Sequence, residues 1–398
     1  MKLIDVCELI VDCPHSTAKD EGQGIPLVRT PNIGKGRLEL SGVHRVSEAV
    51  YNQRIERAVP KAGDLILARE APVGNVALIM PGQKVCLGQR VVLIRPDKEK
   101  ADAAYLTYYL LSEEVQHRLK NSANGAVVAH LNMNEIRNLV IDLPEISIQK
   151  RIATILSSLD DKIALNNRIN HNLEEQAQAL YKSWFVDFEP FKGGKFVDSE
   201  LGMIPEGWRV ATLGEVTLEM RDKVGARQDV KVLSPVTTGQ LVLSEEFFTK
   251  QVFSESIAKY LVVHPNDFAY NPARVNIGSL GKNEFDYDGC VSPVYVVFRC
   301  ETGYEYFFDL YRTTKPFKEE VISRSNGGVR QTLGYKDFAL IKLVYPPKSV
   351  IKEFNTIYSN MLMGMKQSGK ENMLLAKHRD ELLPKLMMGE ICFRDLTC

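Results

Sequence analysis

The chain has 398 residues, of which 25% are charged, and its 50 Lys and Arg residues balance 50 Asp and Glu residues. This neutrality excludes a global basic field that would attract a polyanion, although it leaves room for a local basic face on one side of the protein.

The cysteine pattern excludes a disulfide or zinc framework. The cysteines are odd in number and include no C-x-x-C pair, so we expect reduced thiols and no metal site. The chain also has no apolar run long enough to cross a bilayer, and its first residues lack a signal-peptide core. We therefore expect a cytoplasmic protein. The cysteines are Cys7, Cys13, Cys86, Cys290, Cys300, Cys392 and Cys398.

Residues 1–143 begin with short, β-branched segments that predict strands. They lie at 25–30, 64–68, 76–79 and 91–94 and are separated by Pro, Gly and Asn. A helix is predicted at about 103–119, where Leu106, Tyr109, Leu110 and Leu119 suit a 3.6-residue period. The pattern predicts a mixed domain with a twisted sheet and flanking helices.

Residues 144–189 predict one long amphipathic helix. No Gly or Pro interrupts the segment between Pro144 and Pro190. At about 1.5 Å per residue, roughly forty residues would reach about 60 Å, which is more than a small domain needs for its own core. The apolar stripe consists of Ile148, Ile152, Ile155, Leu159, Ile163, Ile169, Leu173, Ala177, Leu180 and Trp184.

A linker at 190–204, rich in Gly, precedes a second domain at 205–345. Its predicted strands lie at 231–233, 267–270 and 294–298, and its predicted helix at 305–322. A second long helix is expected within 346–398, where Gly364, Gly369 and Pro384 weaken it. We expect this helix to bend or end early near Pro384.

The two halves are related by an internal repeat. Asn124-Gly125, Leu131 and Pro144 recur 202 residues later as Asn326-Gly327, Leu333 and Pro346, and Cys86 and Arg95 match Cys290 and Arg299 at a displacement of 204. Likewise, Asp64, Arg69 and Gly74 are matched with Asp267, Arg274 and Gly278. Of the ten stripe positions, eight remain apolar after displacement by 202. The repeat predicts an α+β chain of two homologous domains, whose two long helices pack as an antiparallel coiled coil.

Three segments of this sequence resemble the specificity subunit of Type I restriction-modification systems. They are Asp160-Asp161-Lys162-Ile163, the run Ser183-Trp184-Phe185-Val186-Asp187-Phe188-Glu189-Pro190-Phe191, and Ile204-Pro205-Glu206-Gly207-Trp208. The resemblance covers the whole chain. It implies two target-recognition domains held apart by two antiparallel helices, with each domain reading one half of a bipartite, asymmetric DNA site.

The resemblance also implies partners and a division of chemistry. The expected partners are double-stranded DNA, two adenine methyltransferase subunits and, in the restriction complex, two ATP-driven translocase-nuclease subunits. The chain itself is expected to be non-catalytic, with S-adenosylmethionine, ATP and Mg on the partner subunits only. In agreement, the nearest match to a methyltransferase N-P-P-[YF] loop, Asn271-Pro272-Ala273-Arg274, lacks the second proline and the aromatic ring.

Polar residues in the loops are the candidate DNA contacts, because Arg pairs with guanine and Asn or Gln with adenine. For each candidate, the alternative is a solvated or turn-forming residue. Arg274 and Asn276 rank first, and Lys35 and Lys282 are expected on phosphate. The candidates are Arg29, Thr30, Asn32, Lys35, Arg69, Asn75, Gln89, Arg90, Thr237, Thr238, Asn271, Arg274, Asn276, Lys282, Arg330 and Gln331.

Four aromatic residues at the end of the first long helix have two interpretations. Trp184, Phe185, Phe188 and Phe191 can pack under the adjacent domain, or they can form a docking surface for the methyltransferase. His130 and His264 have no Cys or carboxylate at ligand spacing and are interpreted as loop residues.

Two other functions stay open at this point. A methylation-only or phage-exclusion system could use the same DNA-recognition subunit. A scaffold whose duplicated domains hold protein partners would explain the balanced charge.

Overall fold

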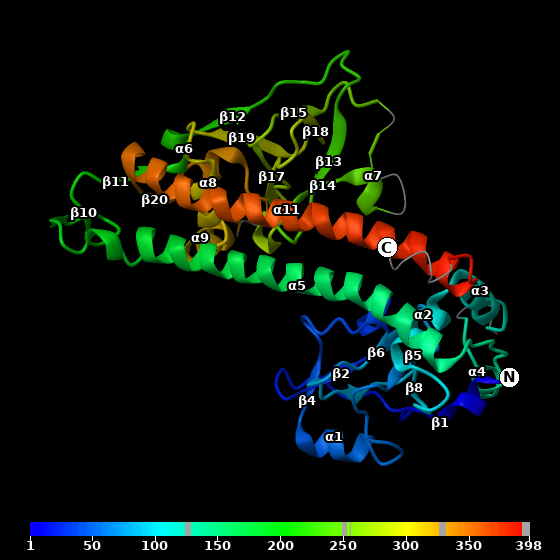
Figure 1. Cartoon of the computed structure of the whole chain (residues 1–398). Coiled ribbons are helices and arrows are strands. Elements are labelled where there is room, and N and C mark those ends of the chain that lie inside the picture. Colours follow the sequence, from blue (N-terminus) through cyan, green and yellow to red (C-terminus); the bar gives the residue numbers. More distant parts are fainter. Residues whose placement is uncertain (124–128, 249–252, 255, 326–331, 392–398) are drawn as a thin grey trace. The chain divides into compact units, whose positions relative to one another are not determined.

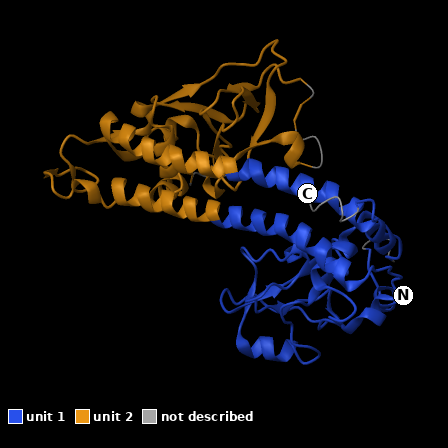
Figure 2. Ribbon diagram, viewed as in Figure 1, with its two compact units in different colours: residues 1–168, 368–398 blue, residues 169–367 orange. Residues whose placement is uncertain are grey.

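The structure is a computed structural model that describes residues 1–123, 129–248, 253–254, 256–325 and 332–391. The chain divides into two compact units, one formed by residues 1–168 with 368–398 and the other by residues 169–367 (Figure 2). In the described ranges, no helix has both the length and the apolarity needed to cross a membrane.

The first unit contains a five-stranded sheet in the order β1-β8-β5-β6-β3 and a three-stranded sheet in the order β4-β2-β7 (Figure 1). All four strands predicted for this half are confirmed, as β2, β5, β6 and β8. Strand β5 lies between two neighbours and is buried at every position, which explains its run Leu-Ile-Leu-Ala. The strands are β1 Cys7–Asp12, β2 Ile25–Val28, β3 Gly36–Arg37, β4 Arg45–Val46, β5 Leu65–Ala68, β6 Val76–Leu78, β7 Cys86–Leu87 and β8 Val91–Pro96.

The helix predicted at 103–119 is in fact two helices. Ser112 adopts an extended backbone (ψ 148°) between them, and its hydroxyl donates to the Tyr109 carbonyl. Glu113 and Glu114 then favour a new helix start, because acidic residues stabilise the first turn. The helices before the long one are η1 Leu3–Val6, η2 Thr30–Asn32, α1 Glu48–Arg54, α2 Ala103–Leu111, α3 Glu113–Asn121 and α4 Met133–Arg137.

The second unit has a related topology, with four strands in each of its two larger sheets. Its main sheet has the order β12-β19-β16-β17, and a second sheet has the order β14-β13-β18-β15. The three strands predicted for this half are confirmed as β13, β16 and β19. The strands of these sheets are β12 Thr217–Met220, β13 Lys231–Pro235, β14 Leu241–Leu243, β15 Leu261–Val263, β16 Phe268–Tyr270, β17 Leu280–Lys282, β18 Gly289–Val291 and β19 Val296–Cys300.

Shorter elements complete the second unit. Two further strand pairs are β9 Phe196–Val197 with β10 Ile204–Pro205, and β11 Arg209–Thr212 with β20 Lys342–Tyr345. The helix predicted at 305–322 is again split, into α8 and α9, with Thr313 and Thr314 bonded back to the end of α8. The helices are η3 Glu189–Phe191, α6 Leu213–Val216, α7 Ser244–Phe247, η4 Val275–Ile277, α8 Glu305–Tyr311, α9 Lys315–Ser325 and α10 Tyr335–Phe338.

The internal repeat is visible in strand pairing and in one ion pair whose carboxylate is buried. Strands β2 and β7 are parallel, as are β13 and β18, and each pair has an antiparallel neighbour, β4 beside β2 and β14 beside β13. In the first copy, Arg95 Nε and Nη2 donate to the two oxygens of Asp64 at 2.7 and 2.8 Å. In the second copy, Arg299 makes the same two bonds to Asp267 at 2.7 and 2.9 Å. The repeat read from the sequence is therefore a repeat of the fold.

The two long helices have the same length and the same displacement. Helix α5 spans Ile146–Phe185 and helix α11 spans Lys348–Met387, 40 residues each and 202 residues apart at both ends. In the first unit, Asp160 on α5 meets Arg379 on α11, and Asn166 meets Asn372. Residue numbers rise along one helix as they fall along the other, so the helices are antiparallel, as predicted for a coiled coil.

The second unit continues the antiparallel contact. Asn170 donates to the Met365 carbonyl, and a Cβ on Gly364 would lie 3.6 Å from Leu173 Cδ1. Of the bend or early end expected near Pro384, the early end is not observed, because α11 includes Pro384 and continues to Met387. Leu386, only 3% exposed, packs with Ile152 and Leu156 in the last turn and holds it in place.

The aromatic residues at the end of α5 pack inside the second unit. Trp184 and Phe185 are 9% and 6% exposed, and both ring systems contact Phe354 of α11. Phe188 and Phe191 are partly buried against the same cluster, where each contacts Trp208. The packing interpretation therefore accounts for Trp184 and Phe185, and a methyltransferase contact by these two buried rings loses its support.

Candidate nucleic-acid interface

In the first unit, the loop after β2 meets the loop after β7. The Gly88 N–H donates to the Val28 carbonyl, and a Cβ on Gly88 would lie 2.9 Å from Arg29 Cγ. Glycine therefore permits the close approach that brings Arg29 and Gln89 together. Arg29 and Gln89 are half-buried.

Thr30 and Asn32 form the short helix η2 and are mostly enclosed. They are 8% and 9% exposed, and the Asn32 side chain accepts a bond from the Arg29 N–H and donates to the Glu39 carbonyl. This placement gives Asn32 a turn-forming role, the alternative considered for every loop residue.

Lys35 and Asn75 lie on the wall of a cavity of about 800 Å³ in the first unit. Asn75 Nδ2 donates to the Ile33 carbonyl at 2.8 Å, which ties the β5–β6 turn to the loop that carries Lys35. Lys35 is exposed. Helices α2 and α3 and the last turns of α11 complete the wall.

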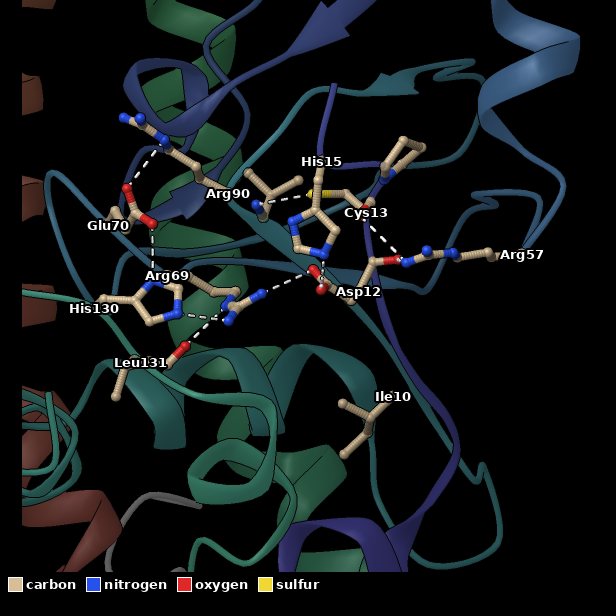
Figure 3. A network of polar contacts seen from close by, with 12 residues as sticks. Ile10, Asp12, Cys13, His15, Arg57, Arg69, Glu70, Arg90, His130 and Leu131 are labelled. Carbon is tan, nitrogen blue, oxygen red and sulfur yellow. Dashed lines mark hydrogen bonds and ion pairs between the residues drawn. The ribbon is translucent and has the colours of Figure 1, made fainter. Parts of the chain in front are cut away.

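Arg69 follows β5 and is a structural residue. Its side chain is only 7% exposed, and its guanidinium donates to the Leu131 carbonyl, Asp12 Oδ1 and His130 Nε2 at 2.8, 2.9 and 2.7 Å (Figure 3). It thereby joins the ends of β5 and β1 to the segment around His130. The prediction that Arg69 reads a base is corrected, because each of its three guanidinium nitrogens already bonds to a group of the protein.

His130 lies between Arg69 and Glu70 (Figure 3). Because arginine only donates, His130 Nε2 must accept from Arg69, and the proton on Nδ1 is donated to Glu70 Oε1 at 2.7 Å. Sequence spacing missed this carboxylate because Glu70 is 60 residues away. His264 is similar, with Nδ1 2.8 Å from Asp288 Oδ1.

Arg90 is an exposed cation of this region. Its backbone φ is +67°, a left-handed conformation, and its side chain is 54% exposed. Arg90 Nε lies 3.0 Å from Glu70 Oε2, so Glu70 bridges His130 and Arg90 (Figure 3). The bridge holds a solvent-facing guanidinium at the loop edge, where it can pair with a base or a phosphate.

In the second unit, two predicted loops are in contact. Gly278 has φ +98°, and a Cβ there would lie 2.6 Å from the Thr237 carbonyl oxygen. Ser279 Oγ also donates to the Pro235 carbonyl at 2.7 Å. The contact gathers the β13–β14 turn and the loop after β16 into one surface. Its members among the predicted residues are the exposed Thr237, Thr238 and Arg274 and the half-buried Asn271 and Asn276.

Lys282 is buried, contrary to the expectation of a phosphate contact. Its side chain is 4% exposed, and Nζ lies 2.8 Å from Asp309 Oδ2. Burial alone would raise the pKa of Asp309, but the Arg312 and Lys282 cations hold that pKa below its usual value. Lys282 is thus the counter-ion of a buried carboxylate. Arg330 and Gln331 lie outside the described residues.

The equivalent loops differ between the copies. The Leu131 N–H donates to the carbonyl of Arg69 and the Leu333 N–H to that of Pro272, so Pro272, and not Arg274, occupies the place of Arg69. The sequence match of Arg69 with Arg274 is thereby corrected. In the described part of the chain, no group of three His, Cys, Asp or Glu side chains is arranged to hold a metal ion.

Comparison with known proteins agrees with the repeated architecture. A family model described as the Type I restriction modification DNA specificity domain matches residues 1–175. The Type I restriction enzyme MjaIX specificity subunit of Methanocaldococcus jannaschii is 26% identical over 99% of this chain and 94% of that protein. Over nearly its whole length, the chain is thus similar to Type I restriction specificity subunits.

Other specificity subunits extend the similarity. The putative MjaX specificity subunit of the same organism is 24% identical over 98% of this chain and 92% of that protein. The crystal structure of the Type-I restriction-modification system S subunit from M. genitalium has a similar fold, with a TM-score of 0.58 and 14% identity over 97% of this chain and 95% of that one.

Proposed function

We propose that this specificity subunit recognises DNA in a Type I restriction-modification complex, and that each domain reads one half of a bipartite, asymmetric site. Support comes from the repeat, because the two copies share a related sheet topology and a buried Asp paired with an Arg, but carry different loops. Two domains of one fold with different loop chemistry suit two different half-sites. A homodimer of identical domains would suit a palindrome.

The exposed loop cations are the proposed DNA contacts. Arg90 in the first domain and Arg274 in the second are exposed, and an arginine fork pairs with guanine in the major groove. Thr237 and Thr238 are exposed beside the Arg274 loop. Lys35 is the proposed phosphate contact, which would contribute affinity and salt dependence rather than sequence choice.

We further propose that catalysis belongs to partner subunits. Two adenine methyltransferase subunits would bind S-adenosylmethionine, and two translocase-nuclease subunits would use ATP and Mg. The specificity subunit would supply no reacting group. The long antiparallel helices would fix the gap between the half-sites, because DNA advances about 3.4 Å per base pair and turns once every 10 to 10.5.

The test is the methylome of a host that expresses this chain with its methyltransferase. The proposal predicts methylated adenines in a bipartite motif with a fixed gap, and a contiguous or palindromic motif would contradict it. Arg274→Ala should relax one half of the motif only, by about 1–3 kcal/mol of discrimination. The matched control is Arg221→Ala, an exposed arginine paired with Glu219 outside the proposed loops, which should leave the motif unchanged.

A further inference from the structure

Two polar side chains interrupt the apolar stripe of α11, and both have polar partners on α5. They are Glu371 and Arg379, the two exceptions among the ten repeated stripe positions. Arg379 Nη1 donates to Asp160 Oδ1 at 2.8 Å. Asn166 Nδ2 donates to Glu371 Oε2 at 2.7 Å, although Asn166 is only 2% exposed. Each polar residue in the stripe of α11 therefore has a polar partner on α5.

Asp160 is the centre of the larger of these contacts. Its side chain is 7% exposed, and its second oxygen accepts a bond from the Tyr108 hydroxyl of α2 at 2.6 Å. Burial and the neighbouring Asp160 carboxylate raise the pKa of Tyr108, so the phenol keeps its proton and donates. The buried carboxylate is satisfied by one group from α2 and one from α11.

The second repeat fills the same three places with apolar side chains. At a displacement of 202, Tyr108 and Asp160 correspond to Leu310 and Leu362, and Arg379 corresponds to Ala177. Ala177 and Leu310 are buried, and Leu362 packs against the same hydrophobic cluster. In the second copy, the fold therefore packs these three positions without any charged side chain. Apolar residues often replace a buried ion pair without loss of stability, so stability alone does not account for the pair.

Because of the internal repeat, each long helix has a possible alternative partner in a second copy of the chain. Since α5 and α11 share most of their apolar stripe, α5 could pair antiparallel with α5 of a second chain, and α11 with α11. In such pairs Asp160 would face Ala177, and Arg379 would face Leu362. A buried charge without a counter-charge costs several kcal/mol. Asp380 lies 2.8 Å from Arg379 and would stay beside it, so the larger penalty would fall on Asp160.

We propose that the Asp160–Arg379 pair directs α5 to α11 of the same chain and disfavours pairing of like helices between two copies. The ion pair keeps the two unlike halves of one chain together. The proposal does not depend on DNA recognition, because it concerns only which helices associate.

The test transfers the residues of the second repeat to the first. The full-length variant Tyr108→Leu, Asp160→Leu, Arg379→Ala is unfolded and refolded at a series of protein concentrations, and its mass is measured by light scattering. The unchanged chain should be monomeric. The triple variant should keep its helix content but raise the dimer-to-monomer ratio by roughly tenfold or more, which corresponds to about 1.4 kcal/mol.

A matched control removes an exposed pair from the same helix. Lys377 and Glu381 are i,i+4 neighbours on α11 with side chains 69% and 56% exposed, and Lys377→Ala with Glu381→Ala should stay monomeric. If the triple variant does not refold, Asp160→Asn with Arg379→Gln removes both charges but keeps polar side chains at both positions, and it should show the same rise. The proposal is overturned if a refolded variant stays as monomeric as the unchanged chain, or if the control dimerises equally.

Discussion

At the scale of single residues, a buried carboxylate sits at the same place in both sheets. The pairing of Leu65 with Ile94 makes Asp64 and Arg95 cross-strand neighbours, and the pairing of Phe268 with Phe298 does the same for Asp267 and Arg299. Asp64 and Asp267 are each 1% exposed. Each carboxylate also accepts a backbone N–H bond, from Lys61 or His264.

The first prediction concerns this pair. Arg95→Ala should lower the free energy of unfolding by about 3 kcal/mol, because it leaves the Asp64 carboxylate buried without its cation. Urea unfolding measures the change. Lys84→Ala, which removes an exposed pair with Glu48, should cost less than about 1 kcal/mol. Equal effects of the two substitutions would contradict the role given to burial.

The second prediction concerns acid stability. The pKa of Asp309 is lowered in the folded protein, relative to an unfolded value of about 3.9. Its stabilising contribution is therefore present above the unfolded pKa and is lost as the pH falls through the folded pKa. Asp309→Asn should reduce stability at pH 7 and flatten the loss of unfolding free energy below about pH 4.

The control for this prediction is Glu319→Gln, which alters an exposed i,i+4 pair with Lys315. It should leave the pH profile of unfolding close to that of the unchanged chain. An Asp309→Asn profile as steep as that of the unchanged chain would show that Asp309 does not carry the acid sensitivity.

The roles of individual residues were harder to predict from the sequence than the secondary-structure elements or the internal repeat. Arg69 and Lys282 are cations at or beside a strand end, as DNA contacts often are, but their partners Asp12 and Asp309 are 57 and 27 residues away. Local sequence cannot show such pairing. By contrast, Glu371 and Arg379 stood out as polar exceptions in a repeated stripe. That signal alone could have located the buried contacts between the helices.

At the scale of elements, the long helices were predictable because their stripes are long and regular. The sequence segment 144–189 contains the observed helix Ile146–Phe185, with ends within a few residues. The shorter helices were less so, since Ser112 divides a segment whose apolar period continues across it. The end of α11 was misjudged because packing of Leu386 outweighs the one backbone bond that Pro384 removes.

The third prediction follows from the glycines of α11. A Cβ on Gly369 meets no heavy atom within 4 Å, and one on Gly364 makes an ordinary contact with Leu173. Gly369→Ala and Gly364→Ala should each raise the free energy of unfolding by about 0.5–1 kcal/mol, because alanine loses less backbone entropy in a helix. Urea unfolding of each variant checks the sign.

Gly281 in β17 is the opposing case. A Cβ there would lie 2.5 Å from backbone atoms of Gln240 and Leu241. Gly281→Ala should therefore lower the free energy of unfolding by about 1–3 kcal/mol, the range for overpacking. A stabilising Gly281→Ala, or destabilising helix variants, would contradict the close-approach argument.

At the scale of the whole molecule, duplication explains both what is shared and what differs. The sheets, the Asp–Arg pairs and the helix lengths are conserved between the copies, whereas Pro272 replaces Arg69 at the loop and Leu362 replaces Asp160 at the helix contact. The repeat was readable from the sequence because it depends on spacing. The loop roles were not, because they depend on which distant side chains the fold brings together.

The central claim is that each domain reads its own half of one site. The most direct measurement exchanges residues 1–143 for the corresponding segment of another specificity subunit and compares the methylomes of hosts that also express the methyltransferase. One half of the motif should change, while the other half and the gap are retained. An unchanged motif, or a change in both halves at once, would contradict the claim.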